Sequence, residues 1–247
     1  MISDAPPAPA RGAASPELIA ELAAYSRQLE TASPQEIVAW AVKNYFPKLT
    51  MATAFGPEGC VIIHMLSEIE PRTHVFNLDT GYQFEETLTL RERIAKRYGI
   101  EVEMRRPATT VPEYEALHGG PLYRTNPDQC CRDRKVKVLR ESVVGWNAWM
   151  SGIRRDQGTG DRAGTPIVAW DEKFGLVKVS PLANWTKKEV WKLITDHDIP
   201  YNPLHDQGYT SIGCWPCTRS VMFGEDERAG RWSGTAKKEC GLHTKDD

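Results

Sequence analysis

The residues best suited to chemistry in this 247-residue sequence are its six cysteines, four of which form two pairs. Cys130 and Cys131 are adjacent, while Cys214 and Cys217 enclose the dipeptide Trp-Pro. We find no secretion signal in the sequence, so we do not expect a disulfide framework. Metal binding or redox chemistry is therefore the better interpretation of the pairs.

The spacing of the pairs helps to choose between kinds of metal site. Structural zinc usually takes spaced pairs, because each thiolate must point to its own tetrahedral corner. A 4Fe-4S cluster is larger and can accept thiolates from two successive residues at the start of a helix. The sequence favours one 4Fe-4S cluster, with zinc, free thiols or disulfides as the alternatives. The expected ligands are Cys130, Cys131, Cys214 and Cys217.

Positive charge follows the first cysteine pair directly, at Arg132, Arg134, Lys135 and Lys137. A four-thiolate cluster is net negative, so cations beside it would offset its charge and tune its potential. Lys135 would lie about one helical turn beyond Cys130. A solvated basic helix face is the usual interpretation of an isolated Lys. Here the adjacent thiols favour a role for Lys135 beside the cluster.

A further cysteine, Cys240, lies near the end of the sequence in "KKECGLH". Neighbouring cations would lower its pKa and raise its thiolate fraction, which favours a nucleophile over an incidental exposed thiol. Two arginines in "RAGRW" could clamp an anion in the same segment. These cations are Lys237, Lys238, His243, Arg228 and Arg231. Cys60, by contrast, lies in the apolar stretch "CVIIHML" and is expected to be a buried packing residue.

The elements that must position these residues alternate between short apolar runs and longer amphipathic ones. Strands are expected at residues 49–55, 73–78, 100–107, 148–153 and 176–182. Helices are expected as a pair within 16–46 and at 60–69, 84–99, 132–144 and 186–195. Two of them open with capping boxes, at Ser33 with Glu36 and at Thr186 with Glu189. The pattern predicts an α/β fold, with a mostly parallel twisted sheet and helices on both faces.

The organisation of the chain follows from its composition. Residues 1–15 are expected to form a disordered Pro/Ala-rich tail, 16–224 one α/β domain, and 225–247 a flexible catalytic tail. No run approaches the roughly 18 apolar residues of a membrane helix. The net charge of -2 argues against nucleic-acid binding. We expect a cytoplasmic protein, and the sequence leaves homo-oligomer formation open.

A ligand of such a sheet binds at the carboxyl ends of its strands. The first strand-to-helix turn, "TAFGPEG" at 53–59, contains two glycines but matches neither the Walker loop nor G-x-G-x-x-G. The second strand ends in Leu78, Asp79, Thr80 and Gly81, where a ligand at the topological switch point would lie. A later strand ends in "SGIRRDQ". Ordinary loop chemistry is the alternative for each motif.

Taken together, these motifs resemble the thioredoxin-dependent adenylyl-sulfate (APS) reductases of assimilatory sulfate reduction and cysteine biosynthesis. Those enzymes belong to the adenine nucleotide α-hydrolase, or PP-loop, superfamily. The resemblance covers about residues 50 to 243. It rests on both cysteine pairs and on "LDTG" at 78–81, "GIRRDQ" at 152–157, "RAGRW" at 228–232 and "ECGLH" at 239–243.

The resemblance implies one 4Fe-4S cluster on the paired cysteines and a nucleophile at Cys240, which would form an S-sulfocysteine. APS would be the substrate, AMP and sulfite the products, and thioredoxin, expected as a separate protein, the electron donor. The implied ligands of the phosphosulfate are Lys135, Arg228, Arg231 and His243. Gly152, Arg162 and the backbone around Leu78 would contact the adenosine. The first loop departs from the S-G-G-x-D-S type of ATP-cleaving relatives.

Three other functions are compatible with parts of the pattern. A 3'-phosphoadenylyl-sulfate (PAPS) reductase, or an enzyme that accepts both nucleotides, would share the fold and the tail cysteine. An ATP pyrophosphatase is disfavoured by the altered first loop. A zinc-stabilised nucleotide-binding regulator without catalytic activity is the alternative from another class.

Overall fold

The structure is a computed structural model that describes residues 14–157, 162–237 and 239–242. Its centre is a six-stranded sheet in the order β3-β2-β1-β4-β6-β5, in which only β5 runs antiparallel to its neighbour. The predicted mostly parallel sheet is thereby confirmed. The strands are β1 (Leu49–Thr53), β2 (His74–Leu78), β3 (Val102–Arg105), β4 (Ala148–Met150), β5 (Val168–Asp171) and β6 (Leu176–Val179).

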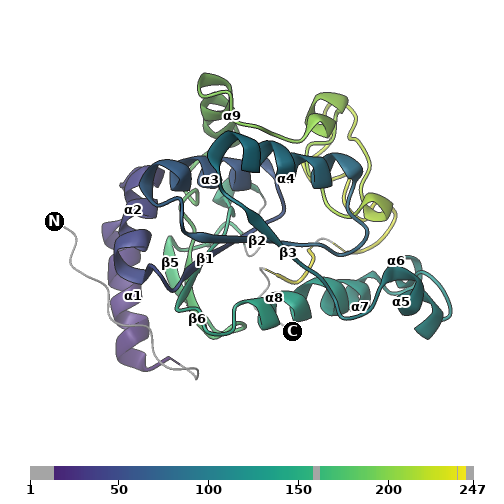
Figure 1. The fold of residues 1–247 in the computed structure, drawn as a ribbon, viewed down its shortest axis with the longest axis horizontal. Helices are drawn as coiled ribbons and strands as arrows, with labels where there is room; N and C mark the ends of the chain where they lie inside the picture. Colours follow the sequence, from purple (N-terminus) through teal and green to yellow (C-terminus); the bar gives the residue numbers. More distant parts are fainter. Residues whose placement is uncertain (1–13, 158–161, 238, 243–247) are drawn as a thin grey trace.

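Helices cover both faces of this sheet, as predicted. Figure 1 shows α3, α4 and α9 on one side of the sheet and α7 and α8 on the other, with α1 and α2 at one end. The longer helices are α1 (Pro16–Gln28), α2 (Pro34–Tyr45), α3 (Pro57–Ile69), α4 (Glu85–Tyr98) and α9 (Lys187–Asp196). Both predicted capping boxes are present, at the starts of α2 and α9.

Among the described residues, four short α-helices and strands have no counterpart in the sequence-based prediction. They are α5 (Val111–Leu117), α6 (Leu122–Thr125), α7 (Pro127–Cys131) and the edge strand β5. Each spans seven residues or fewer, too short for a helical or strand period to stand out.

The segment predicted as a helix over 132–144 is helical from Arg132 to Ser142, but its first part is not α-helical. A turn of π-helix, Arg132–Val136, separates α7 (Pro127–Cys131) from α8 (Lys137–Ser142). Such π-turns occur frequently at functional sites. This turn directs Lys135 into the interior, whereas Arg132 and Lys137 are exposed.

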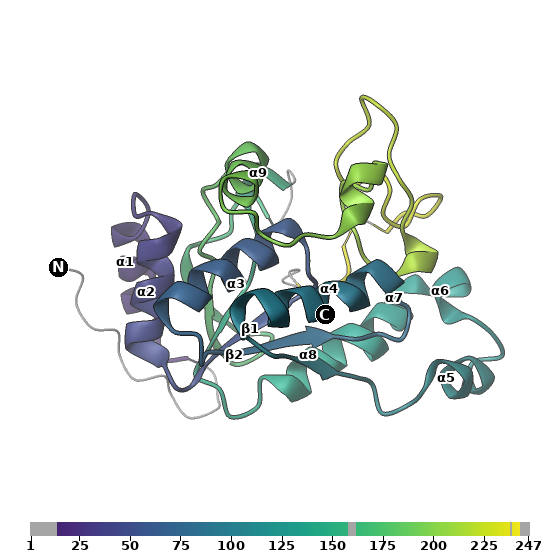
Figure 2. The same cartoon turned by 45° about the horizontal axis from the view of Figure 1, so that its top comes forward.

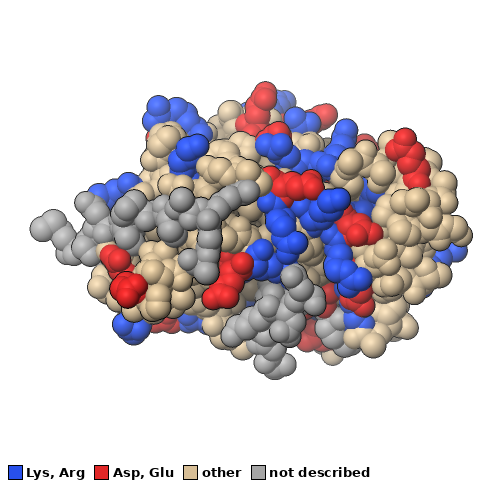
Figure 3. Space-filling view, turned by 90° about the horizontal axis from the view of Figure 1, so that it is seen from below, with Lys and Arg blue, Asp and Glu red and all other residues tan. Residues whose placement is uncertain are grey.

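The solvated-face interpretation therefore holds for only part of this basic segment. Its exposed cations are Arg132, Lys137 and Arg140. Figure 3 shows Lys and Arg side chains gathered in the middle of the face that is seen from below, the side on which α8 lies in Figure 1.

The hydrophobic core lies between the sheet and its helices. Its packing fixes the strands whose carboxyl ends line the site. Cys60 is 1% exposed within this core, which confirms it as a packing residue. The chain passes from β1 to β2 on one side, and β4 pairs with β1 on the other. The space between β1 and β4 is thus the switch point at which a ligand is expected.

Beyond α9 the chain is irregular, as predicted. The described part of this region contains only the 3-10 turns η3 (Pro203–Gln207) and η4 (Trp215–Cys217). Figure 2 shows it as a lobe beside the end of α4. Isolated bridges join Gln83 to Cys214 and Thr218 to Arg231, so the lobe is tied to the loop after β2 and to itself.

Some predictions concern residues beyond the described ranges. The expected N-terminal tail lies largely there, and so does His243. Flexibility of 225–247 stays a prediction. No helix in the described residues is long and apolar enough to span a membrane.

Candidate active site

A cavity opens at the carboxyl ends of β1, β2 and β4, at the switch point, and residues 205–242 form its other wall. The segment after β1 contributes Gly56 and Glu58, and the loop after β4 contributes Ser151 and Gly152. Most of the predicted site residues meet here, from segments far apart in the sequence. They are Leu78, Thr80, Lys135, Gly152, Arg162, Cys214, Arg228, Arg231 and Cys240.

Asp79 and Gly81 do not line this cavity. The Asp79 carboxylate accepts hydrogen bonds from Arg106 Nε at 2.7 Å and from the Gly81 N–H at 2.9 Å. Gly81 has φ +78°, and a Cβ there would lie 2.6 Å from Val111 Cγ2. These residues shape the loop that presents Leu78 and Thr80, and glycine is required at its turn.

The paired cysteines meet in a second, smaller cavity beside the first. It is lined by Cys130, Cys131, Cys214 and Cys217, with Lys135 and Arg231 between the two cavities. Backbone hydrogen bonds hold the second pair, from Trp215 N to Tyr82 O at 2.8 Å and from Trp232 N to Cys217 O at 2.9 Å. Thr80 Oγ1 lies 3.3 Å from Cys214 Sγ. The fold therefore brings all four predicted metal ligands to one place.

Three thiols of this small cavity, those of Cys130, Cys131 and Cys217, have a pKa that burial raises. Burial, with the neighbouring thiols, raises the pKa of Cys130 to about 12 and that of Cys217 to about 11. Across the described part of the chain, no three His, Cys, Asp or Glu residues are arranged to hold a single metal ion. The four sulfurs are soft donors that could hold a larger iron-sulfur group, because each iron corner of such a group takes one thiolate.

Cys240 lies in a different environment, half-buried at the cationic end of the first cavity. Burial alone would raise its pKa, but Lys135, the Leu242 backbone and Arg231 lower it below the usual value. In turn the pKa of Lys135 is raised, although burial opposes this, by Cys214 and Cys240. Lys135 thus stands between the paired cysteines and the tail cysteine.

Packing and a glycine fix the position of Arg231. Its guanidinium carbon lies 4.4 Å from the centre of the Trp232 ring, and its Nη1 donates to Ile212 O at 3.2 Å. A Cβ on Gly213 would lie 2.1 Å from Arg231 Nη2. Only glycine at 213 leaves room for the observed position of this guanidinium.

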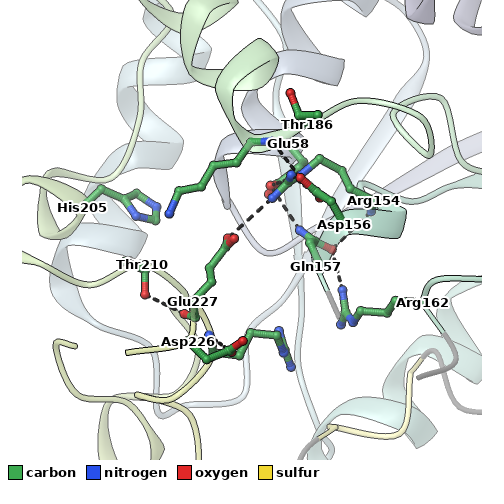
Figure 4. A network of polar contacts seen from close by, with 12 residues as sticks. Glu58, Arg154, Asp156, Gln157, Arg162, Thr186, His205, Thr210, Asp226 and Glu227 are labelled. Atoms are coloured by element: carbon green, nitrogen blue, oxygen red, sulfur yellow. Dashed lines mark hydrogen bonds and ion pairs between the residues drawn. The ribbon is translucent and has the colours of Figure 1, made fainter. Parts of the chain in front are cut away.

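A buried polar network supports the other end of the cavity (Figure 4). Arg154 is fully buried; its Nε donates to Glu58 at 2.8 Å, and its Nη2 lies 3.5 Å from Glu227. Gln157 donates to Glu58 at 3.1 Å and accepts from Arg162 Nη1 at 2.6 Å. The network therefore connects the first turn to Arg162 at the cationic end.

Several residues of this site were not predicted from the sequence. Arg154 and Gln157 lie within the quoted "GIRRDQ", and Glu239 directly precedes Cys240, so local motifs marked their segments but not their roles. Their partners lie 77 to 99 positions away in the sequence. The unpredicted residues are Glu58, Arg154, Gln157, Lys187, His205, Glu227 and Glu239.

Comparison with known sequences gives consistent matches over most of the chain. Residues 48–220 match the phosphoadenosine phosphosulfate reductase domain. A protein of Gloeobacter violaceus named phosphoadenosine 5'-phosphosulfate reductase is 45% identical, over 88% of this chain and 91% of that protein. The adenosine 5'-phosphosulfate reductase of Salinibacter ruber is 45% identical over 94% and 92%. Adenosine 5'-phosphosulfate reductase 1 of Bacillus subtilis is 46% identical over 84% and 89%.

Solved structures agree with these matches. A phosphate complex of phosphoadenylyl-sulfate reductase from Candida auris has a TM-score of 0.72 and 32% identity, covering 86% of this chain and 100% of that one. FMN adenylyltransferase of Candida glabrata, in complex with ATP, has a TM-score of 0.52 at 15% identity, covering 77% of this chain and 62% of that one. The second likeness concerns the fold alone.

Proposed function

Because the chain belongs to the phosphoadenosine phosphosulfate reductase family, we propose that it reduces APS to sulfite and AMP in sulfate assimilation. The observation that carries this proposal is the position of Cys240, a thiol at the cationic end of a cavity at the switch point. Lys135, Arg228 and Arg231 surround that end. A nucleotide that carries an anionic, electrophilic sulfur matches this combination of charge and nucleophile.

The first chemical step is nucleophilic substitution at the sulfate sulfur. APS binds with its adenosine along Leu78 and Gly152 and its sulfate directed to Lys135. The Cys240 thiolate attacks the sulfur, the bond from sulfur to the bridging oxygen breaks, and AMP leaves with that electron pair. The product on the enzyme is an S-sulfocysteine at Cys240.

The cations make this step feasible. Without them the anionic substrate would repel the approaching thiolate, and charge building on the departing phosphate would be unsupported. Lys135, Arg228 and Arg231 counter both effects in a partly buried site, where water screens them little. Arg231 is pre-positioned by Trp232, so the site spends little free energy on reorganising it.

The second step consumes two electrons from a dithiol, for which we propose reduced thioredoxin. One of its thiolates attacks the Cys240 sulfur, the sulfur-sulfur bond breaks, and sulfite leaves. Its second thiol then resolves the mixed disulfide, which restores Cys240 and yields oxidised thioredoxin. Both electrons are accounted for by the donor dithiol.

We further propose that the four paired cysteines hold one 4Fe-4S cluster, since all four line one small cavity and such a cluster takes four soft thiolate ligands. When bound, it supplies a compact negative charge beside Lys135. The chain contributes the cavity walls: Thr80 lies beside Cys214, and Arg134 is buried among Tyr82 and Tyr114 close by. Iron and acid-labile sulfide in purified protein would support the cluster, whereas zinc would support the nucleotide-binding regulator.

The choice of APS over PAPS is supported by the relatives of Salinibacter ruber and Bacillus subtilis, which are named adenosine 5'-phosphosulfate reductases. The relative of Gloeobacter violaceus is named for PAPS, so a direct comparison of the two substrates is the test. We therefore expect a higher kcat/KM for APS than for PAPS in a side-by-side assay, and equal values would support the dual-specificity alternative.

The decisive experiment is anaerobic incubation of the holoenzyme with APS, without any thiol donor, followed by peptide mass spectrometry. We expect an adduct of about 80 Da, the mass of SO3, on the peptide that contains Cys240. The Cys240→Ser variant should show none. AMP release without a covalent adduct would contradict the proposed intermediate.

A further inference from the structure

Glu239, the residue directly before the proposed nucleophile, is bound by two arginines of the cavity wall. Arg162 donates to it through Nε at 2.7 Å and Nη2 at 3.0 Å, and Arg228 Nη2 donates at 3.2 Å. The side chain of Glu239 is 23% exposed and that of Arg162 11%. The bidentate contact is the strongest geometry available to a guanidinium and a carboxylate.

The two arginines need an anion between them. Burial, together with the charge of Arg162, lowers the pKa of Arg228, which reflects the cost of placing two guanidinium groups close together away from water. Leaving such charges without a counter-ion is strongly unfavourable. In this structure the counter-ion comes from the chain itself, one residue before Cys240.

We propose that Glu239 is a positioning residue: its carboxylate occupies the place of the substrate's anionic group on Arg162 and Arg228, holds Cys240 beside Lys135, and is displaced when substrate binds. The inference rests on the proposed function. A phosphosulfate carries two negative charges against one on Glu239, so the exchange favours the substrate. Displacement frees the main chain at Cys240 to align with the sulfur.

The test is Glu239→Gln, which keeps the shape of the side chain and removes its charge. Because the competing anion is gone, we expect AMP to bind about threefold to tenfold more tightly to the holoenzyme in calorimetry. The KM for APS should fall by a similar factor. Iodoacetamide should alkylate Cys240 several-fold faster in the ligand-free variant, because the ion pairs from Glu239 to Arg162 and Arg228 no longer hold the tail. Peptide mass spectrometry measures this rate.

A merely structural role for Glu239 predicts the opposite result, weaker AMP binding, and that result or unchanged binding would overturn the proposal. Glu239→Asp keeps the charge and should stay closer to the unmodified enzyme. Glu225→Gln is the matched control: this carboxylate pairs with Arg219 at 2.8 Å in the same segment but lies outside the cavity. If the unmodified enzyme bound no AMP, the proposed function would fail. If Cys240 were alkylated at the same rate in the Glu239→Gln variant, only the proposal that Glu239 holds Cys240 in place would fail.

Discussion

Two sulfur-bearing regions lie on either side of Lys135 and differ in how the fold holds them. Cys130 and Cys131 end α7, whereas Cys214 caps η4 and Cys217 ends it. Backbone hydrogen bonds tie this second pair to the loop after β2 and to the turn at Trp232. The contacts that hold Cys240 include the ion pairs of Glu239, a backbone hydrogen bond from Leu242 and the packing of the Leu242 side chain. Four thiols around one small cavity suit the proposed cluster, whereas a thiol that lines the main cavity suits the proposed nucleophile.

The electrostatics of the two regions point the same way. Burial, together with the neighbouring thiols, raises the pKa of Cys130. The pKa of Cys240 is lowered despite burial, chiefly by Lys135. Lys135 thus lies beside both regions, and of Cys130 and Cys240 only the tail cysteine has a lowered pKa.

The sharpest way to break this comparison is Cys240→Ser. We expect sulfite formation to fall by about a thousandfold or more, because a serine hydroxyl at neutral pH is a far weaker nucleophile than a thiolate. Iron content and AMP affinity should stay near those of the unmodified enzyme. Coupled sulfite assays and calorimetry measure both, and Cys60→Ala, in the core, serves as a control that keeps activity. Sustained turnover by the serine variant would remove Cys240 from the mechanism.

The complementary change is Cys214→Ser, in the fixed region. Here we expect loss of most iron and sulfide and a drop in activity of about a hundredfold, since losing one ligand of a shared group weakens the whole site. Thermal unfolding should shift downward in this variant but hardly at all in Cys240→Ser. A Cys214→Ser protein with full iron content would contradict the assignment of the paired cysteines.

The sequence predicted these two regions to different degrees. The α/β fold, the order of most elements and the grouping of the paired cysteines followed from periodicity and spacing. The π-turn did not, because Arg132–Val136 has the composition of an ordinary helix, and only its tertiary contacts decide which way Lys135 points.

The polar network was also beyond prediction from the sequence. No role was predicted for Arg154 within "GIRRDQ", yet it is fully buried and paired with Glu58 and Glu227 from distant segments. Nor was a role predicted for Glu239, which pairs with Arg162 77 positions away. Local patterns report elements and motifs, whereas pairings between distant charged side chains are set by the assembled fold.

A smaller effect should follow from Gly213→Ala, which shifts Arg231, the cation between the two cavities, without removing its charge. The added methyl group would displace the Arg231 guanidinium, so we expect kcat/KM for APS to fall by about tenfold while iron content is retained. Gly164→Ala is the matched control, because a Cβ there meets nothing within 4 Å. Equal kinetics for the two variants would mean that Arg231 does not need its observed position.

The smallest expected effect concerns the apolar anchor of the tail. Leu242 packs on the cluster that contains Phe76 and Leu78, and truncation to Ala would remove roughly 1 kcal/mol of burial from a half-buried side chain. We expect kcat for sulfite formation to fall about twofold to fivefold and Cys240 alkylation to accelerate. AMP affinity should fall slightly, because Leu242 lines the cavity but binds no anion, whereas Glu239→Gln should raise it. Tighter AMP binding in Leu242→Ala would show that any loosening of the tail exposes Arg162 and Arg228 to the ligand. The Glu239 carboxylate would then not be the group that holds Cys240 in place.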